Sequence, residues 1–81
     1  MVKITFYNLI RSRYKVEEMY VKSGTIHSMI HQILETYPKM DKRDFETCII
    51  FRDGKTIHYF KFDTVINDGE EIIITHFVGG G

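Results

Sequence analysis

The sequence predicts a single α+β domain in which one helix packs across one face of a mixed sheet of four or five strands. Three observations favour this class. The first residues alternate between apolar and polar side chains, as in a half-buried strand. Residues 26–37 have the period of an amphipathic helix. Two Asp-Gly pairs then separate runs that are rich in β-branched and aromatic residues.

The opening strand is predicted over residues 2–8, because the apolar side chains of Val2, Ile4 and Phe6 fall on one face. Residues 9–14 break this alternation, and we expect them to form a turn. The pattern therefore places one face of the first strand in the core and leaves the other face in solvent.

A second strand is expected within residues 15–21. Val16 and Tyr20 fall on one of its faces, whereas Met19 and Val21 fall on the other. Since each face carries large apolar side chains, the pattern leaves the inward face of this strand open.

The helix follows, because the period of the apolar residues changes. Ser23 or Thr25 can cap its first turn. Pro38 disfavours helical geometry in the residue before it, which ends the helix. The apolar positions recur at i, i+3, i+4, i+7, i+8 and i+11, and they are Ile26, Met29, Ile30, Ile33, Leu34 and Tyr37. We expect this helix to be a main contributor to the core.

The second half of the chain is predicted to be rich in strands. A polar connection over residues 39–46 leads to a hairpin whose turn is Asp53-Gly54, since both central residues of a type I′ turn need positive φ. In the longer connection that follows, we expect Phe62 and Ile66 to pack under the sheet.

The last strand is predicted over residues 70–77 and is the most apolar of all. Ile72 and Ile74 share one face with His76, and Ile73 lies on the other face. We expect so apolar a strand at the centre of the sheet, with a neighbour on each side. The predicted order of strand, strand, helix, strand, strand, strand is that of the ubiquitin-like β-grasp fold.

Composition and charge argue against several classes of function. The chain of 81 residues, 43% of them hydrophobic, suffices for one small domain with a core. Lys and Arg number 11, as do Asp and Glu, so no net charge favours nucleic acid or an anionic membrane. The sequence has no signal-peptide core and no apolar run near the about 20 residues that span a bilayer. Because Cys48 is the one cysteine, we expect no disulfide and a cytoplasmic location.

The motifs in the interior of the sequence are weak indications of chemistry. Residues 53–56, Asp-Gly-Lys-Thr, are similar to the end of a phosphate-binding loop, but Ile49 replaces the first glycine of that motif. A hairpin turn explains them better. His27 and His31 have the i, i+4 spacing of a metal pair, but Ser28 stands where zinc proteases have Glu and no third ligand is near. We interpret the two histidines as exposed residues that flank the apolar face, with a metal site as the alternative.

Cys48 has two interpretations. It is either a nucleophile with His58 or His76 as its base, or a small apolar side chain in a buried strand. We favour the second, because no neighbouring positive charge is evident that would lower the pKa of the thiol. The carboxylates cluster in predicted turns and form no visible acid–base pair. We expect a chain that is not itself an enzyme and that has no cofactor.

The chain resembles the ubiquitin-like sulfur carriers of the ThiS/MoaD family over nearly its whole length. The resemblance rests on four segments, which are VKITFYNLIR (2–11), TIHSMIHQIL (25–34), INDGEEIII (66–74) and the final VGGG (78–81). The opening strand is closer to the small subunit of molybdopterin synthase, and the ending is closer to the thiamine carrier. His76 and Phe77 stand where the molybdopterin branch usually has a pair of prolines.

The resemblance implies that the carboxylate of Gly81 is the reactive group. An ATP-dependent adenylating enzyme (ThiF/MoeB-like) would convert it to an acyl-adenylate. A persulfide from a sulfur donor of the cysteine desulfurase type would then displace AMP and leave a thiocarboxylate. An acceptor synthase (ThiG-like or MoaE-like) would use the sulfur to make thiamine thiazole, or molybdopterin or tungstopterin.

The same resemblance divides the chain into a β-grasp domain, residues 1–78, and a flexible glycine tail, residues 79–81. Val78, Gly79 and Gly80 would thread with the terminus into a partner's active site, since glycine adopts backbone conformations that other residues do not.

The resemblance also implies that the exposed side of the last strand meets the adenylating enzyme. Phe77 and Ile73 are the candidate docking residues, with burial in the core as the alternative. Two other functions stay open. One is a ubiquitin-like modifier that is joined to lysines through the same carboxylate, and the other is a non-catalytic interaction module with an incidental tail. A sulfur relay that forms cysteine or methionine is also open as the pathway.

Overall fold

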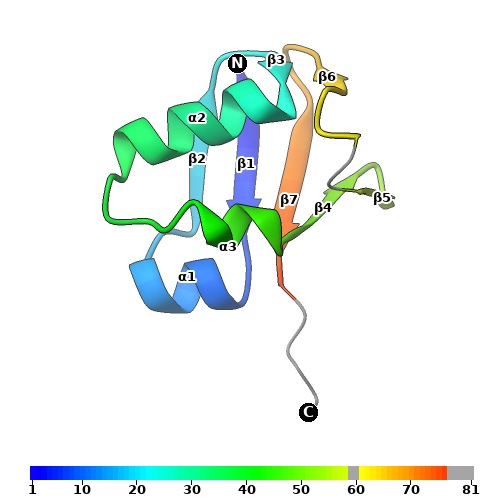
Figure 1. Ribbon diagram of the computed structural model, residues 1–81. Coiled ribbons are helices and arrows are strands. Elements are labelled where there is room, and N and C mark those ends of the chain that lie inside the picture. Colours follow the sequence, from blue (N-terminus) through cyan, green and yellow to red (C-terminus); the bar gives the residue numbers. More distant parts are fainter. Residues whose placement is uncertain (59–60, 77–81) are drawn as a thin grey trace.

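The computed structural model describes residues 1–58 and 61–76. Within them, a five-stranded sheet and a two-stranded sheet pack with three helices (Figure 1). In chain order the elements are β1 (Val2–Phe6), α1 (Leu9–Tyr14), β2 (Glu18–Val21), β3 (Gly24–Thr25), α2 (Ile26–Thr36), α3 (Arg43–Glu46), β4 (Ile49–Arg52), β5 (Lys55–Ile57), β6 (Val65–Ile66) and β7 (Glu71–Thr75).

The main sheet has the strand order β2-β1-β7-β4-β5, and β3 pairs with β6 at its side. Strand β7 runs parallel to β1, with Ile72 opposite Ile4 and Ile74 opposite Phe6. On its other side β7 runs antiparallel to β4, where Ile74 faces Ile50. The predicted mixed sheet, and the central place of the last strand in it, are therefore confirmed.

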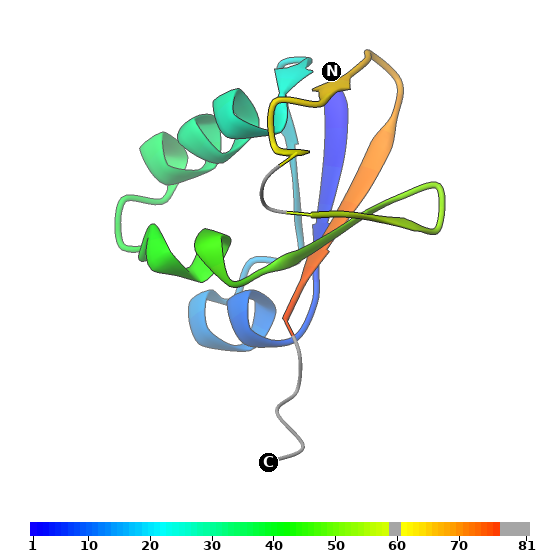
Figure 2. The ribbon, with the colours of Figure 1, turned by 45° about the vertical axis from the view of Figure 1, so that its right-hand side comes forward.

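The core lies between the sheet and a layer of helices, in which α2 crosses the strands and α3 follows it (Figure 2). Strands β1 and β7 turn every second side chain into this layer, as a period of two requires. Phe62 and Ile66 are buried beneath the sheet as expected. The fully buried side chains are Phe6, Phe45, Phe62, Ile4, Ile10, Ile26, Met29, Ile33, Ile50, Ile66, Ile72 and Ile74.

The structure resolves the inward face of the second strand. Val21 of β2 is buried and faces Val2, while Met19 is half-buried and faces Ile4. Tyr20, between them, is 60% exposed. Val16 is buried as well, but it precedes β2. The sequence pattern counted it within the strand, and this left the inward face undecided.

The prediction of a turn at residues 9–14 was wrong, because these residues form α1. Ile10 is fully buried and fixes this short helix against the core. Lys15 ends the helix in the left-handed region, at φ 61° and ψ 31°, and its N–H donates to the carbonyl of Arg11. A helix of six residues is too short for its period to stand out from a strand's alternation.

The polar connection predicted at residues 39–46 was also described incompletely, because it contains α3. Met40 and Phe45 from this segment are buried at 5% and 2% exposure. Two apolar side chains among charged neighbours are enough to hold the segment on the core, although they form no recognisable period.

The predicted cap and turns are confirmed. Thr25 caps α2, because its hydroxyl oxygen accepts from the N–H of Ser28 at 3.1 Å. The helix ends at Thr36, two residues before Pro38. In the hairpin between β4 and β5, Asp53 and Gly54 have φ of 52° and 76°, as a type I′ turn requires.

Two ion pairs and a hydrogen bond from a backbone N–H hold the turn that leads into β7. Arg52 donates to the carboxylate of Glu70 at 2.7 Å, and this bond holds the pKa of Glu70 below its usual range. Glu70 also accepts from the N–H of Asn67 at 3.1 Å. The N-terminal ammonium of Met1 lies 3.1 Å from Asp68. These contacts fix the start of β7 beside the start of β1.

Shortening a side chain at the centre of the sheet tests this arrangement. Ile74→Ala should lower the free energy of unfolding by about 2–5 kcal/mol, because Ile74 is fully buried and its truncation leaves a cavity. The matched control is Val65→Ala, since Val65 is 53% exposed, and we expect it to cost less than about 0.5 kcal/mol. Urea unfolding measures both variants, and equal losses would contradict the described core.

Candidate functional site

The predicted reactive residues mostly lie outside the part of the chain that the structure describes. These are Phe77, Val78, Gly79, Gly80 and Gly81. Ile73 is described, and so is the point from which the chain continues toward the others. That point is the carboxyl end of β7, at Thr75 and His76, beside α1 and α3 (Figure 1).

Asn8, which follows β1, holds the end of β7 through its side chain. The amide nitrogen Nδ2 donates to the hydroxyl oxygen of Thr75 at 2.7 Å and to the backbone carbonyl of His76 at 2.9 Å. Just before it, the N–H of Tyr7 donates to the carbonyl of Ile74 at 2.9 Å. One backbone hydrogen bond from Tyr7 and the side chain of Asn8 therefore extend the pairing of β1 with β7 beyond the end of β1.

The ring of His76 holds the same point from the helical layer. His76 is only 7% exposed, and its Nε2–H donates to the backbone carbonyl of Asp44 in α3 at 2.5 Å. The carboxylate of Asp44 in turn accepts from the hydroxyl of Tyr14 at 2.8 Å and lies 3.5 Å from the guanidinium of Arg13. The last described residue of the chain is thus linked to α3 and, through α3, to α1.

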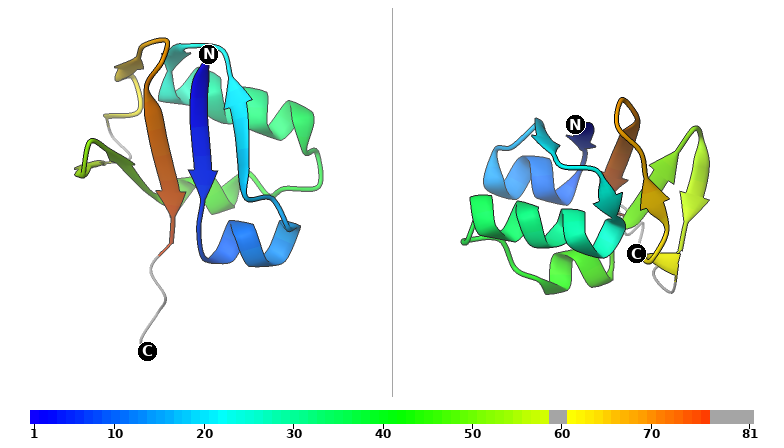
Figure 3. Two further views of the ribbon diagram at one scale, coloured as in Figure 1. Left: turned by 180° about the vertical axis from the view of Figure 1, so that it is seen from behind. Right: turned by 90° about the horizontal axis from the view of Figure 1, so that it is seen from above.

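Ile73 alternates with the buried Ile72 and Ile74, so its side chain points to the other face of the sheet, which no helix covers (Figure 3, left). It is half-buried, with Thr5 of β1 opposite it on one side and Phe51 of β4 on the other. It is not part of the core cluster. Tyr20, on the same face, is 60% exposed. The open face therefore has apolar side chains at Ile73 of β7 and Tyr20 of β2, with Lys3 and Thr5 of β1 between these two strands.

The histidines of α2 do not come together. The ring of His27 packs edge-on against Phe62, with 5.8 Å between ring centroids. The Nε2 of His31 lies 2.7 Å from the carboxylate of Glu35, one turn further along the helix. Among residues 1–58 and 61–76, no group of three or more His, Cys, Asp or Glu side chains could hold a metal ion.

Cys48 is held as a neutral thiol. Its side chain is half-buried, packs against the core, and donates to the carbonyl of Phe45 at 3.2 Å. Burial raises the pKa of Cys48 to about 12, so almost no thiolate forms near neutral pH. Cys48 therefore packs against the core as interpreted, but it precedes β4 and does not lie within a strand.

A hollow of about 850 Å³ runs along α1. Two of its charged side chains compensate each other, since Arg11 forms a salt bridge with Glu17 at 3.0 Å. The hydroxyl of Ser12 donates to the carbonyl of Leu9 at 3.3 Å, as helix serines commonly do, and is not aligned with a base. Within the described residues that line it, the hollow has no pairing of nucleophile and base.

Comparison with known proteins supports the fold. No protein-family model matches the chain, and no curated protein matches it in sequence. Among solved structures, the crystal structure of SAMP1 from Haloferax volcanii aligns over 99% of this chain and 98% of that chain, with a TM-score of 0.77. The chain has the ubiquitin-like β-grasp fold. The two sequences are 11% identical, so this likeness concerns the fold alone.

No helix in the described part of the chain is both long enough and apolar enough to cross a membrane.

Sequence reasoning missed the residues that hold the end of β7. Asn8 and Asp44 contact Thr75 and His76 across 67, 68 and 32 positions of sequence. The local signal at Asn8, an Asn between a strand and an apolar stretch, indicates only a turn or a helix cap. A partner so distant in sequence becomes visible only once the strand order is known.

The burial of Cys48 can be tested by its reactivity. A disulfide reagent such as DTNB should react slowly with the native thiol at pH 7–8, because the pKa of Cys48 is raised to about 12. Unfolding should accelerate the reaction, since the thiol pKa then returns to about 8.5. The matched control is Thr47→Cys in a Cys48→Ala background, because Thr47 is exposed. A native Cys48 that reacts as fast as the control thiol would contradict its described burial.

Proposed function

We propose that this protein is a ubiquitin-like sulfur carrier, in which the carboxylate of Gly81 is adenylated and then converted to a thiocarboxylate. The chain itself acts as a protein co-substrate of an adenylating enzyme and of a sulfur-transfer synthase. The sulfur is used in the synthesis of a cofactor, either thiamine thiazole or molybdopterin or tungstopterin.

One observation carries the proposal. The central strand of a ubiquitin-like fold, β7, ends at Thr75, and five residues that finish in Gly-Gly-Gly follow His76, the last residue that the structure describes. Fully extended, five residues span about 17 Å, enough to cross the wall of a partner's active site. Glycine has no Cβ, so such a segment fits a narrow channel and adopts the backbone angles that the channel imposes.

The proposed reaction needs no catalytic group from the carrier itself. The carboxylate attacks the α-phosphorus of ATP and pyrophosphate leaves, which gives an acyl-adenylate. A persulfide sulfur then attacks the acyl carbon and AMP leaves, and a second thiol must cleave the new S–S bond to release the thiocarboxylate. The enzymes supply the metal, the acids and bases and the persulfide. A folded body and an accessible carboxylate are what the carrier contributes.

The open face of the sheet is the proposed docking surface for the adenylating enzyme. Ile73 on β7 and Tyr20 on β2 supply apolar area on this face, and β7 leads from Ile73 to the end of the described chain. With Phe77 as the second proposed docking residue, docking there would direct Val78 and the residues after it into the partner.

Intact-mass measurement tests the proposal. Incubation with ATP, an adenylating enzyme of the ThiF/MoeB type and a persulfide donor should replace one oxygen of the Gly81 carboxylate by sulfur. The result should be absent without ATP, because the carboxylate alone is a poor electrophile.

The control variant lacks Gly80 and Gly81 but retains the residues that fold. It should unfold at the same temperature as the full chain and stay unmodified. Modification of the truncated chain would rule out Gly81 as the reactive residue, and recovery of isopeptide-linked conjugates in place of a thiocarboxylate would favour a protein modifier.

Introducing a charged side chain on the open face of the sheet tests the proposed docking surface. Ile73→Glu should raise KM for the adenylating enzyme about five- to thirty-fold with kcat little changed, because a buried charge weakens an apolar contact. Val65→Glu is the matched control, since Val65 is exposed on β6, outside the main sheet. Equal KM values for the two variants would place the docking surface elsewhere.

A further inference from the structure

The backbone of Asn8 has a conformation that favours glycine. Its φ is 57° and its ψ is −124°. This is the geometry of the first central residue of a type II′ turn, where glycine is preferred because a Cβ is strained. The chain therefore holds a residue with a side chain where the backbone alone would be more stable with glycine.

The backbone strain at Asn8 is not offset by a hydrogen bond from its side chain to the first turn of α1. Asn8 is the N-cap residue, and its backbone carbonyl accepts from the N–H of Ser12 at 2.9 Å. At such a position the Asn side chain commonly accepts from a backbone N–H of the first helical turn, yet here it makes no such bond. Asn8 therefore does not use its side chain to cap the helix, which is the usual role of asparagine at this position.

Both hydrogen bonds of the side-chain amide go to the end of β7 instead. Nδ2 reaches the hydroxyl of Thr75 at 2.7 Å and the carbonyl of His76 at 2.9 Å. Because a backbone carbonyl only accepts, it fixes which end of the Asn8 amide faces it. The amide nitrogen of Asn8 is the donor at this point, and neither glycine nor aspartate has a side-chain N–H to replace it.

We propose that Asn8 is a positioning residue, which fixes the direction in which the chain leaves the domain after His76. Its amide holds the backbone carbonyl of His76 from the side of β1, while the contact between the His76 ring and Asp44 holds it from α3. The effect of Asn8 on activation of Gly81 rests on the proposed function. Its effect on the geometry of His76 does not.

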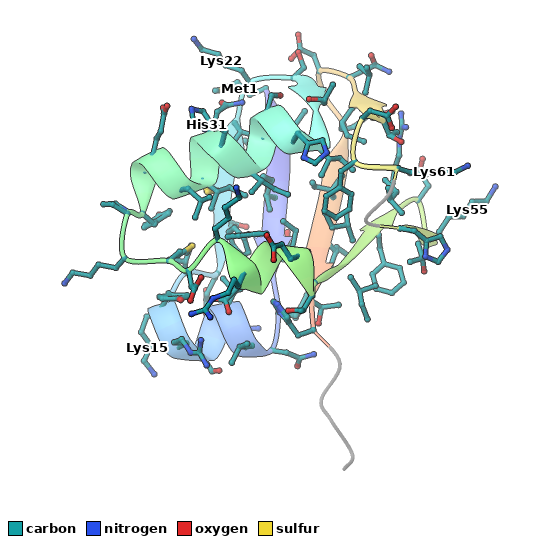
Figure 4. All side chains as sticks on the ribbon, in the orientation of Figure 1. Met1, Lys15, Lys22, His31, Lys55 and Lys61 are labelled. Atoms are coloured by element: carbon teal, nitrogen blue, oxygen red, sulfur yellow. The ribbon has the colours of Figure 1, made fainter. Side chains whose placement is uncertain are left out.

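Three variants separate positioning from stability. Asn8→Gly removes the amide and relieves the backbone, so the melting temperature should stay within about 5 °C of that of the wild type. Asn8→Asp keeps the size and the tolerance of positive φ but has no N–H to donate. Lys15→Gly is the control, because Lys15 has φ 61° at the other end of α1 (Figure 4) and makes no contact with β7 through its cap.

The first measurement needs no partner. The NMR order parameter of the His76 carbonyl, from relaxation of its carbonyl carbon, should be that of a rigid backbone, about 0.85, in the wild type and in Lys15→Gly. It should fall in Asn8→Gly and Asn8→Asp, because the carbonyl of His76 loses its donor. An unchanged order parameter in Asn8→Gly would overturn the proposal.

The second measurement is the rate at which an adenylating enzyme of the ThiF/MoeB type adenylates the chain. The exchange of pyrophosphate into ATP reports this rate. Both Asn8 variants should lower kcat about five- to thirty-fold with KM unchanged, since the docking face is intact and the terminus reaches the active geometry less often. Unchanged kcat in spite of a loosened His76 would overturn the proposal and leave the carrier function standing. A wild-type chain that is never adenylated, with His76 loosened in the variants, would uphold positioning by Asn8 and refute the carrier function.

Discussion

Strands β1 and β7, the first and last of the chain, lie side by side in parallel at the centre of the sheet, with Ile4 opposite Ile72 and Phe6 opposite Ile74. Parallel pairing brings the carboxyl ends of two strands to the same edge. Neither strand can shift by one residue without moving its buried side chains to the open face. The helices, the short sheet and the end of β7 are all placed by this one pairing.

The end of β7, from which the chain continues to its C-terminal residues, lies beside the end of β1. Asn8 is the second residue after β1, and this alone brings its amide within reach of His76. Asp44 in α3 reaches the same histidine from the core side. The point from which the chain continues to the proposed reactive carboxylate of Gly81 is therefore fixed by contacts with β1 and α3.

The sequence predicted what depends on local pattern and missed what depends on distant contacts. The alternation in β1 and β7, the apolar face of α2 and the positive φ of Asp53-Gly54 follow from side-chain period and turn chemistry. Helix α1 was mistaken for a turn, because six residues show too little of a helical period. The contacts of Asn8 and Asp44 with the end of β7 could not be predicted, since they join residues that only the strand order brings together.

The central claim is that Gly81 carries sulfur in the cell. Its most direct test is mass spectrometry of the C-terminal peptide from protein that is purified from its native cells under conditions that preserve thioacids. The account predicts a fraction of chains that end in a Gly81 thiocarboxylate, and this fraction should fall when the supply of persulfide is blocked. Chains that end only in a free carboxylate, or that are joined to lysines of other proteins, would contradict it.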